Sequence, residues 1–143
     1  MDGKSAFPAP GKRNEIAMNI VTENTLDAGN LFEKLGKQNS GSVIFHYAVV
    51  KNQAGERPTA GIRFEPGGDM EAEMAEIEAD IRKRWSVNDI LLVRRIGLLQ
   101  IGDLISLVAV SSAASSDAFE ACRYGLARIR KMASVRKTEL FLD

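Results

Sequence analysis

Positively charged side chains gather in the last third of the chain and form the clearest chemical feature of the sequence. Six cations lie between residues 123 and 137, with one acid, Glu120, just before them: Arg123, Arg128, Arg130, Lys131, Arg136 and Lys137. Another cation, Lys51, follows an apolar run. Such a cluster could hold a phosphate or a carboxylate, and a partly desolvated lysine can serve as an acid, a base or a nucleophile. The sequence therefore predicts an anion-binding site near the end of the last helix.

The same charges are also compatible with two roles that involve no small anionic ligand. Lys and Arg are common in the last turns of helices, where the unpaired carbonyl groups carry partial negative charge, so the cations could simply be solvated. Nucleic-acid binding is a weaker possibility, because the cluster is short and has Tyr124 as its only nearby aromatic. The chain is also neutral overall, with 19 Lys plus Arg against 19 Asp plus Glu.

The sequence offers little support for a metal site, a nucleophilic catalytic site or a nucleotide-binding loop. One histidine, His46, and one cysteine, Cys122, cannot form a tetrahedral zinc site without many carboxylates, so we expect no metal. His46 falls in a strand-like run with no Ser or Cys motif beside it, which favours a structural role. Cys122 falls on the apolar stripe of the last predicted helix, which favours a packed thiol. The sequence contains no phosphate-loop or glycine-rich dinucleotide pattern.

The composition indicates one globular domain. Hydrophobic residues make up 45% of the chain and charged residues 27%, which is ordinary globular usage. Residues 1–14 are polar and rich in Pro and Gly, so we expect a flexible arm there and a single domain over 15–143. A single cysteine, the lack of a secretory signal and the lack of an apolar run of about 18 residues favour the cytoplasm, without membrane association.

Hydrophobic patterning predicts the elements that must position the cations. Strands are expected over 16–22, 42–50, 60–65, 90–96 and 104–110, with a polar loop over 51–58. A short helix, capped by Asn24 or Thr25, would carry Leu26, Leu31, Phe32 and Leu35. The clearest helix spans 70–85, where Met70, Met74, Ile77, Ile81 and Trp85 form one stripe.

The last helix should start near Ser116 or Asp117, with a capping box formed by Asp117 and Glu120. Its predicted buried face comprises Phe119, Cys122, Leu126, Ile129 and Ala133. The apolar residues 140–142 must dock on the fold or on a partner. The pattern predicts an α+β fold with a mixed or largely antiparallel sheet and about three helices.

Several short segments carry, in order along the chain, a resemblance to a known family. They are Met74-Ala75-Glu76-Ile77, Arg84-Trp85, Arg95-Ile96-Gly97, Gly102-Asp103, Ser112-Ala113 and Ala118-Phe119-Glu120-Ala121. Together they resemble the MoaE family, the large catalytic subunit of molybdopterin synthase. Residues 133–139 are similar to its Ala-Pro-x-Trp-Lys-x-Glu ending, and Val50-Lys51-Asn52 is similar to its Val-Arg-Asn. The resemblance runs from about Ile20 to Glu139.

This resemblance implies an α/β-hammerhead-like fold, usually a homodimer, that works with a small ubiquitin-like subunit ending in Gly-Gly. The end of that subunit carries a thiocarboxylate, whose sulfur goes to a cyclic pyranopterin phosphate to build the dithiolene of molybdopterin. The pterin phosphate would be the substrate, and no permanently bound cofactor is implied. Because both reactants are anions, their meeting requires fixed cations.

The resemblance also assigns roles by position. Lys137 matches the lysine of the Trp-Lys-x-Glu ending, a catalytic residue, and Arg130 falls where the family has its other active-site lysine. Substrate binding is implied for Lys51, Lys131, Ser115, Arg136, Thr138 and Glu139.

The sequence departs from the family most clearly in the small-residue segment 112–116. This segment reads Ser-Ala-Ala-Ser-Ser where the family reads Ser-Ala-His-Arg-Ser, so the His and Arg that would meet the pterin or its phosphate are absent. Arg130 keeps a positive charge, but a guanidinium cannot act as a proton-transferring amine. Two hypotheses follow: a sulfur transferase with Lys137 as its working amine, or a catalytically impaired paralogue that binds or regulates a ubiquitin-like partner.

Overall fold

Alternating apolar residues build a four-stranded sheet, here called the main sheet, at the centre of the fold. The computed structural model describes residues 17–33, 35 and 40–142, and the strand order in this sheet is β1-β5-β7-β2. The strands are β1 (Ala17–Thr22), β5 (Ile90–Arg95), β7 (Leu104–Ser112) and β2 (Ser42–Val49). β1 runs parallel to β5, and the other two pairings are antiparallel, so the sheet is mixed.

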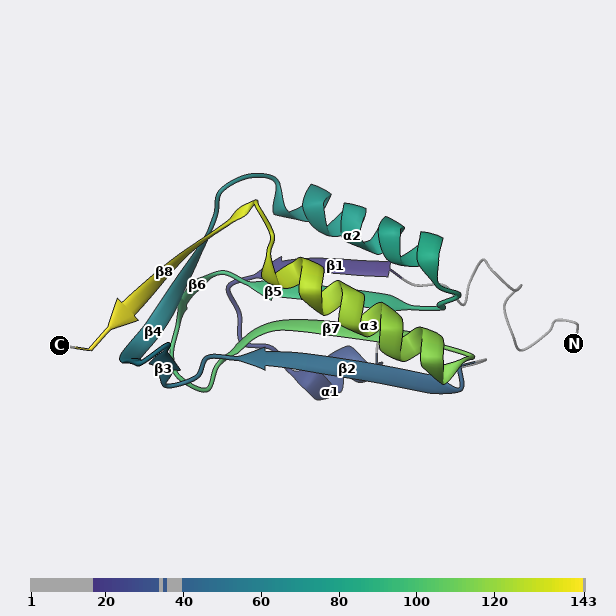
Figure 1. Cartoon of the computed structure of the whole chain (residues 1–143), viewed down its shortest axis with the longest axis horizontal. Helices are drawn as coiled ribbons and strands as arrows, with labels where there is room; N and C mark the ends of the chain where they lie inside the picture. The colour runs from purple at the N-terminus through teal and green to yellow at the C-terminus, as the bar shows by residue number, and fades with distance from the viewer. Residues whose placement is uncertain (1–16, 34, 36–39, 143) are drawn as a thin grey trace, which may run out of the picture.

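Helices cover both faces of the main sheet (Figure 1). On one face, helices α2 (Met70–Arg84) and α3 (Ser115–Arg130) bury an apolar core that includes Leu92 and Val108. On the other face, the short helix α1 (Ala28–Glu33) contributes Leu31 to a second core, which includes Leu91. Because both faces are covered, β5 is buried at every position.

Helix α2 is fixed by local sequence signals at both ends. The Asp69 side chain accepts a hydrogen bond from the Ala72 N–H at 3.0 Å and caps the start of the helix. Acids in the first turn and the cations Arg82, Lys83 and Arg84 in the last turn suit the helix dipole. These charges at its two ends therefore stabilise the helix itself.

A second sheet forms one end of the molecule (Figure 1). Its long strand β4 (Arg57–Pro66) pairs antiparallel with β3 (Gln53–Ala54), β6 (Gly97–Leu99) and β8 (Val135–Phe141). Val50, Ile62, Phe64 and Leu99 form the buried cluster beneath this sheet. The second sheet thus brings the segment after α3 back against a strand from the middle of the chain.

The structure confirms the predicted α+β class, with a mixed sheet and three helices in the described part of the chain. The five predicted strands and the long helix lie within a few residues of their predicted bounds. No helix among the described residues is long and apolar enough to cross a bilayer. The arm expected over residues 1–14 lies outside the described residues.

The predicted start of α3 near Ser116 is confirmed to within one residue, but the predicted caps of α1 and α3 were both wrong. The Asp27 side chain accepts a hydrogen bond from the Asn30 N–H and caps α1, in place of Asn24 or Thr25. Helix α3 begins at Ser115, and its N-cap residue Ala114 makes no side-chain cap hydrogen bond, so the capping box does not form. The chain is turned instead by the Ser112 hydroxyl, which donates to the Ser86 carbonyl and accepts from the Ala114 N–H.

The buried face of α3 also differs from the prediction. Phe119 is 56% exposed, and the buried residues of this helix are Ala118, Ala121, Cys122, Gly125 and Ile129. Small residues are required because the helix lies close to the sheet: a Cβ on Gly125 would lie 3.1 Å from the Val108 side chain. The predicted face was wrong at Phe119 because the prediction followed the large apolar residues rather than the small ones.

Three strands, β3, β6 and β8, were not predicted at all. Strand β8 contains the charged run Arg136-Lys137-Thr138-Glu139, which has no apolar alternation. The strand forms because its backbone pairs with β4 from Thr59 to Pro66. The apolar end at Leu140 and Phe141 therefore docks on this chain, through β4.

Gly61 offers a test of how the second sheet is held together. Its φ is +157°, and a Cβ at this position would lie 2.5 Å from the Leu99 carbonyl oxygen of β6. We expect Gly61→Ala to lower the free energy of unfolding by roughly 3 kcal/mol, since a strained backbone and a clash with a neighbouring strand combine. Gly55→Ala is the control, because Gly55 has φ +65° but no atom within 4 Å of a Cβ, and should cost about 1 kcal/mol. Urea denaturation measures both, and equal losses would contradict the proposed close approach.

Candidate functional site

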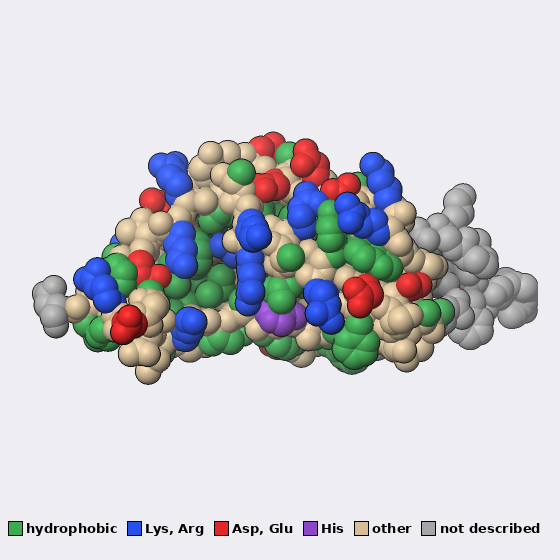
Figure 2. Space-filling view, in the orientation of Figure 1, with side chains coloured by type: hydrophobic (Ala, Val, Ile, Leu, Met, Phe, Trp, Pro, Cys, Tyr) green, Lys and Arg blue, Asp and Glu red, His purple; other side chains and the backbone are tan. Residues whose placement is uncertain are grey.

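A cavity of about 730 Å³ lies where the main sheet meets the second sheet, beside the C-terminal end of α3. This volume is typical of a site for a small molecule. Its wall combines residues of β2, β4, β5, β7, β8 and α3, and the polar side chains that concern chemistry are His46, Lys51, Arg94, Ser106, Arg130, Lys137 and Glu139. Figure 2 shows the single histidine of the chain at this surface, with Lys and Arg side chains on both sides of it.

The register of the main sheet builds one wall of this cavity. Arg94 of β5 lies directly opposite Ser106 of β7, and directly opposite residues share one face of a sheet. Two residues further along β7 on the same face, Val108 lies between Leu92 and His46. Leu92 and Val108 belong to the core under α2 and α3. This face of the main sheet is therefore apolar at the Leu92–Val108 pair and polar at the next pair on the same face, Arg94 and Ser106, near the end of α3.

Strand β8 supplies the facing wall through its alternation. Lys137 and Glu139 both line the cavity, and the Lys137 Nζ lies 3.8 Å from the Glu139 Oε1. Arg136 and Thr138 alternate with them and do not line it. The Arg136 guanidinium instead donates to the Pro66 carbonyl at 3.0 Å. Of the four β8 residues implied by the family resemblance, the structure brings two to the cavity.

Glu139 is held in place by its neighbour Thr59. The Thr59 hydroxyl lies 2.5 Å from the Glu139 Oε2 and donates to it, and the Glu139 side chain is only 14% exposed. The carboxylate therefore has a fixed position from which its other oxygen faces the Lys137 amine. This arrangement keeps a positive and a negative group side by side in the cavity wall.

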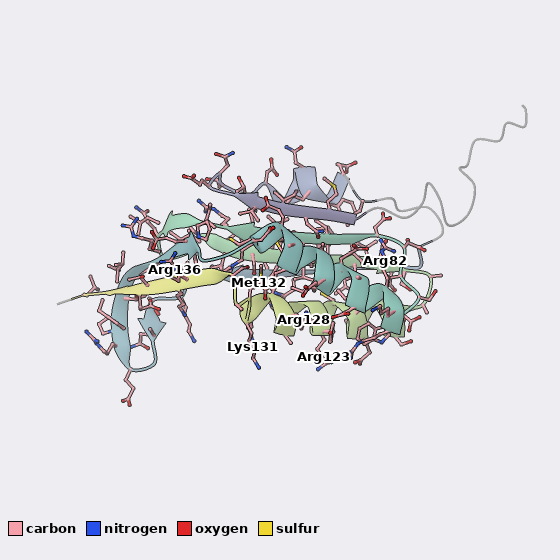
Figure 3. The ribbon with its side chains drawn as sticks, turned by 90° about the horizontal axis from the view of Figure 1, so that it is seen from above. Arg82, Arg123, Arg128, Lys131, Met132 and Arg136 are labelled. Carbon is pink, nitrogen blue, oxygen red and sulfur yellow. The ribbon has the colours of Figure 1, made fainter. Side chains whose placement is uncertain are left out.

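The cations near the end of α3 point in different directions and make different contacts. Arg130 lines the cavity, whereas Lys131 does not and projects outward from the end of the helix (Figure 3). Arg128 lies 2.7 Å from Asp80 of α2. The hydrogen bond to Asp80, followed by the one to Tyr124, raises the pKa of Arg128 above its ordinary value. Arg128 thus ties α3 to α2, and Arg130 is the cation of this segment that faces the cavity.

Glu73 positions the turn that joins α3 to β8. Its carboxylate accepts the N–H groups of Ala133 and Ser134 at 2.9 and 2.8 Å. Desolvation opposes ionisation, but the hydrogen bonds from Ser134 and Ala133 and the charge of Arg128 outweigh it, so the pKa of Glu73 lies below its ordinary value. Because this turn lies between Arg130 and Lys137, Glu73 helps to set the spacing of those two cations.

Sequence reasoning missed Arg94 and assigned His46 to a structural role. Arg94 is 6% exposed, its guanidinium carbon lies 4.4 Å from the centre of the Phe64 ring, and burial lowers its pKa to about 10. The Nδ1 of His46 is buried without a hydrogen-bond partner among the described residues. The available signal was the pair Arg94-Arg95 at the end of an apolar strand, since alternation must send the two cations to opposite faces.

Ser115 lies at the opposite end of α3 from the cavity. The helix has 16 residues, so its two ends are about 24 Å apart at 1.5 Å per residue. Within one chain, neither Ser115 nor its neighbour Ala114 can contribute to the cavity. The small-residue segment and the cationic cluster are therefore two separate places on this fold.

The charge balance of the cavity favours anions. Four cations line it, Lys51, Arg94, Arg130 and Lys137, against the one carboxylate of Glu139. Across the described ranges, no cluster of three or more His, Cys, Asp or Glu residues could hold a metal ion. The arrangement can attract and orient negatively charged ligands, and Lys137 adds an amine that can exchange a proton.

Comparison with known proteins places this geometry in a family. A family model described as MoaE protein matches residues 21–132, which is more than half of the chain. The chain belongs to the MoaE family. The molybdopterin synthase catalytic subunit of Bacillus subtilis (strain 168) is 27% identical over 124 residues, covering 86% of this MoaE-family chain and 79% of that protein.

Solved structures of MoaE-type proteins share the fold. Molybdopterin synthase from Staphylococcus aureus matches with a TM-score of 0.79 and 27% identity, over 87% of this chain and 91% of that one. A complex of subunits 1 and 2 of molybdopterin-converting factor from Helicobacter pylori matches with a TM-score of 0.68 and 15% identity, over 87% and 84% of the two chains. At that identity the second likeness shows the fold alone.

The Glu73 contact predicts a pH-dependent contribution to stability. We expect Glu73→Gln to lower the free energy of unfolding by about 1–2 kcal/mol at pH 7, because two backbone N–H groups lose a charged acceptor. Since the folded-state pKa of Glu73 lies below its ordinary value of 4.5, this stabilisation is complete above that value and is lost as the pH falls through the lower folded-state pKa. Urea denaturation between pH 3 and pH 7 measures the difference. Glu76→Gln, on the exposed side of the same helix, should show no such pH-dependent loss.

Proposed function

We propose that this chain is a molybdopterin synthase catalytic subunit. In its cavity, sulfur would pass from the C-terminal thiocarboxylate of a small ubiquitin-like subunit ending in Gly-Gly to a cyclic pyranopterin phosphate. The observation that carries this proposal is the convergence of Lys51, from the loop after β2, with Arg130 of α3 and Lys137 of β8 on one cavity of suitable size. Family membership and the named relatives support it.

The main physical task of such a site is to bring two anions together. Two unit negative charges 4 Å apart repel by about 4 kcal/mol at the effective dielectric constant near a protein surface. Four cations against one carboxylate leave the cavity with a net positive charge that offsets this repulsion. Charge-assisted hydrogen bonds from guanidinium and ammonium groups then fix the geometry of the reactants.

The side chains divide the chemistry according to what each can do. Lys137 carries an amine that can take part in proton transfer, and its Nζ lies 3.8 Å from the neighbouring Glu139 carboxylate. A guanidinium is suited to hold an anion rather than to transfer a proton, so Arg130 serves to bind, as does Lys51 in the loop after β2. In the net reaction the acyl carbon of the tail loses its sulfur and takes an oxygen from water, ending as a carboxylate. A pterin carbon forms a C–S bond and breaks a C–O bond, and its departing oxygen substituent leaves with a proton from that water, so no oxidant or reductant is needed.

The proposed partners are a small subunit and a second copy of this chain. The Helicobacter pylori structure is itself a complex of two subunits, which supports a small-subunit partner here. A homodimer would give Ser115 a route to a cavity, because the α3 start of one copy could approach the cavity of the other. No permanently bound cofactor is proposed, and the expected cytoplasmic location stays a prediction.

One observation favours a second function, that of a binding or regulatory protein. Ala114 and Ser115 stand where the family has His and Arg, so two cationic contacts to the pterin or its phosphate are missing. Loss of two charge-assisted hydrogen bonds of about 1.5–3 kcal/mol each could cost several orders of magnitude in binding or rate. The chain would then still grip a ubiquitin-like tail without completing the chemistry.

Reconstitution distinguishes the two functions. Purified protein is mixed with thiocarboxylated small subunit and cyclic pyranopterin phosphate, and the molybdopterin formed is measured. We expect product from the wild-type protein and at least a hundredfold less from Lys137→Ala, because the variant loses the amine that lies beside Glu139 in the cavity wall.

Lys83→Ala is the matched control, since it removes one exposed lysine at the end of α2, away from the cavity. It should leave the yield unchanged. No product from the wild-type protein, with the tail still bound, would favour the binding protein over the enzyme. Undiminished product from Lys137→Ala would reject Lys137 as the working amine.

A further inference from the structure

Arg94 is a buried cation without a counter-charge among the described residues. Its side chain is 6% exposed, its Nε has no hydrogen-bond partner, and no carboxylate of the described residues pairs with it. The adjacent Arg95 makes the contrast clear. Arg95 is equally buried, and its Nε is also without a partner among the described residues. Its guanidinium, however, donates to the Glu23 carbonyl at 3.1 Å and lies 3.9 Å from the Asp103 carboxylate, contacts that Arg94 lacks in the same part of the chain.

An uncompensated buried charge is costly. Removing a guanidinium from water carries a penalty of several kcal/mol unless ion pairs and hydrogen bonds replace the lost hydration. The stacking of Arg94 on the Phe64 ring, at 4.4 Å, recovers only part of this penalty. The same burial lowers the pKa of Arg94 to about 10, so the group is still charged at neutral pH.

The surroundings of Arg94 suit a ligand rather than the packing of the protein. Arg94 lines the cavity, and Ser106, directly opposite it in the sheet register, adds a hydroxyl to the same wall. His46 lines the same wall. Its Nδ1 is a second buried nitrogen without a hydrogen-bond partner among the described residues. Two unpartnered nitrogens and a hydroxyl thus lie around one stretch of the main sheet.

We propose that Arg94, together with Ser106, forms an internal subsite that holds the phosphate group of the substrate. The identity of this ligand rests on the proposed function, whereas the existence of an oxyanion subsite does not. Lys137 lies on the second sheet, where it would meet the reacting end of the tail. Arg94 lies on the main sheet, and a guanidinium that transfers no proton is suited to the anion that does not react. A planar fork of N–H donors also matches phosphate oxygens two at a time.

Inorganic phosphate tests the subsite without any assumption about the reaction. The melting temperature of wild type, Arg94→Met and Arg63→Met is measured with increasing phosphate, against sodium chloride at equal ionic strength. Arg63 is the matched control, because it is an exposed arginine of β4 that does not line the cavity. Phosphate should raise the melting temperature of wild type and Arg63→Met, and the increase should be lost in Arg94→Met.

The same experiment separates a binding role from a structural one. If Arg94 binds a ligand, Arg94→Met without phosphate should melt no lower than wild type, because an uncompensated charge has been removed. Equal stabilisation of all three proteins by phosphate would overturn the proposal. Should Arg94→Met fail to fold, Arg94→Lys keeps the charge without the fork, and its response to phosphate should be clearly weaker than that of wild type; an undiminished response would count against the subsite.

Calorimetry with each of the two reactants shows which of them binds at the Arg94 subsite. We expect Arg94→Met to weaken binding of cyclic pyranopterin phosphate by about ten- to a hundredfold, the loss of one charge-assisted contact, and to leave unchanged the binding of a peptide ending in Gly-Gly. A loss of peptide binding instead would show that the subsite takes the carboxyl end of the tail and would overturn the phosphate assignment. If the wild-type protein bound neither reactant but still responded to phosphate through Arg94, the proposed function would fail and the oxyanion subsite would stand.

Discussion

Repulsion among like charges is the constraint on which this structure depends. Four cations share the wall of one cavity with a single carboxylate, so at most one of them can have an adjacent counter-charge there. Lys137 has Glu139 beside it, and Arg94 lies against Phe64. Lys51 and Arg130 are exposed and keep much of their hydration. A site built in this way is stable when empty but gains most when an anion enters.

The side chains that line the cavity come mainly from two sheets, and each sheet contributes a different wall. The main sheet, covered by helices on both faces, is a rigid base, and its register decides where the apolar face ends and Arg94 begins. The second sheet adds Lys137 and Glu139 through the alternation of β8. The Glu73 contact ties α2, which covers the main sheet, to the turn that leads into β8 of the second sheet. Small-residue packing at Gly125 brings α3 close enough to the main sheet for its end to border the cavity.

Hydrophobic patterning predicted the main sheet and α2 because their residues are buried and their pattern reports burial directly. It could not predict β8, since a strand of charged residues is stabilised by pairing with β4 across a long stretch of chain. The family resemblance singled out Lys51, Arg130, Lys137 and Glu139, which the structure brings to one cavity. It also singled out Lys131, Arg136, Thr138 and Ser115, which lie elsewhere in this chain, because charge alone does not reveal the face of a strand or the direction of a helix end. Arg94 was missed because a cation beside a buried strand resembles an ordinary strand end.

The pairing of β8 with β4 has a consequence for how the molecule is assembled. The contact between Thr59 and Glu139 joins residues 80 positions apart, so the second wall of the cavity can close only when nearly the whole chain is present. The main sheet and both long helices precede β8 along the chain, so they can be in place before the cavity gains its second wall. A nascent chain that has not yet reached β8 would therefore already contain every core strand of the main sheet and both long helices and yet lack Lys137, so chemical competence is the last property acquired during synthesis.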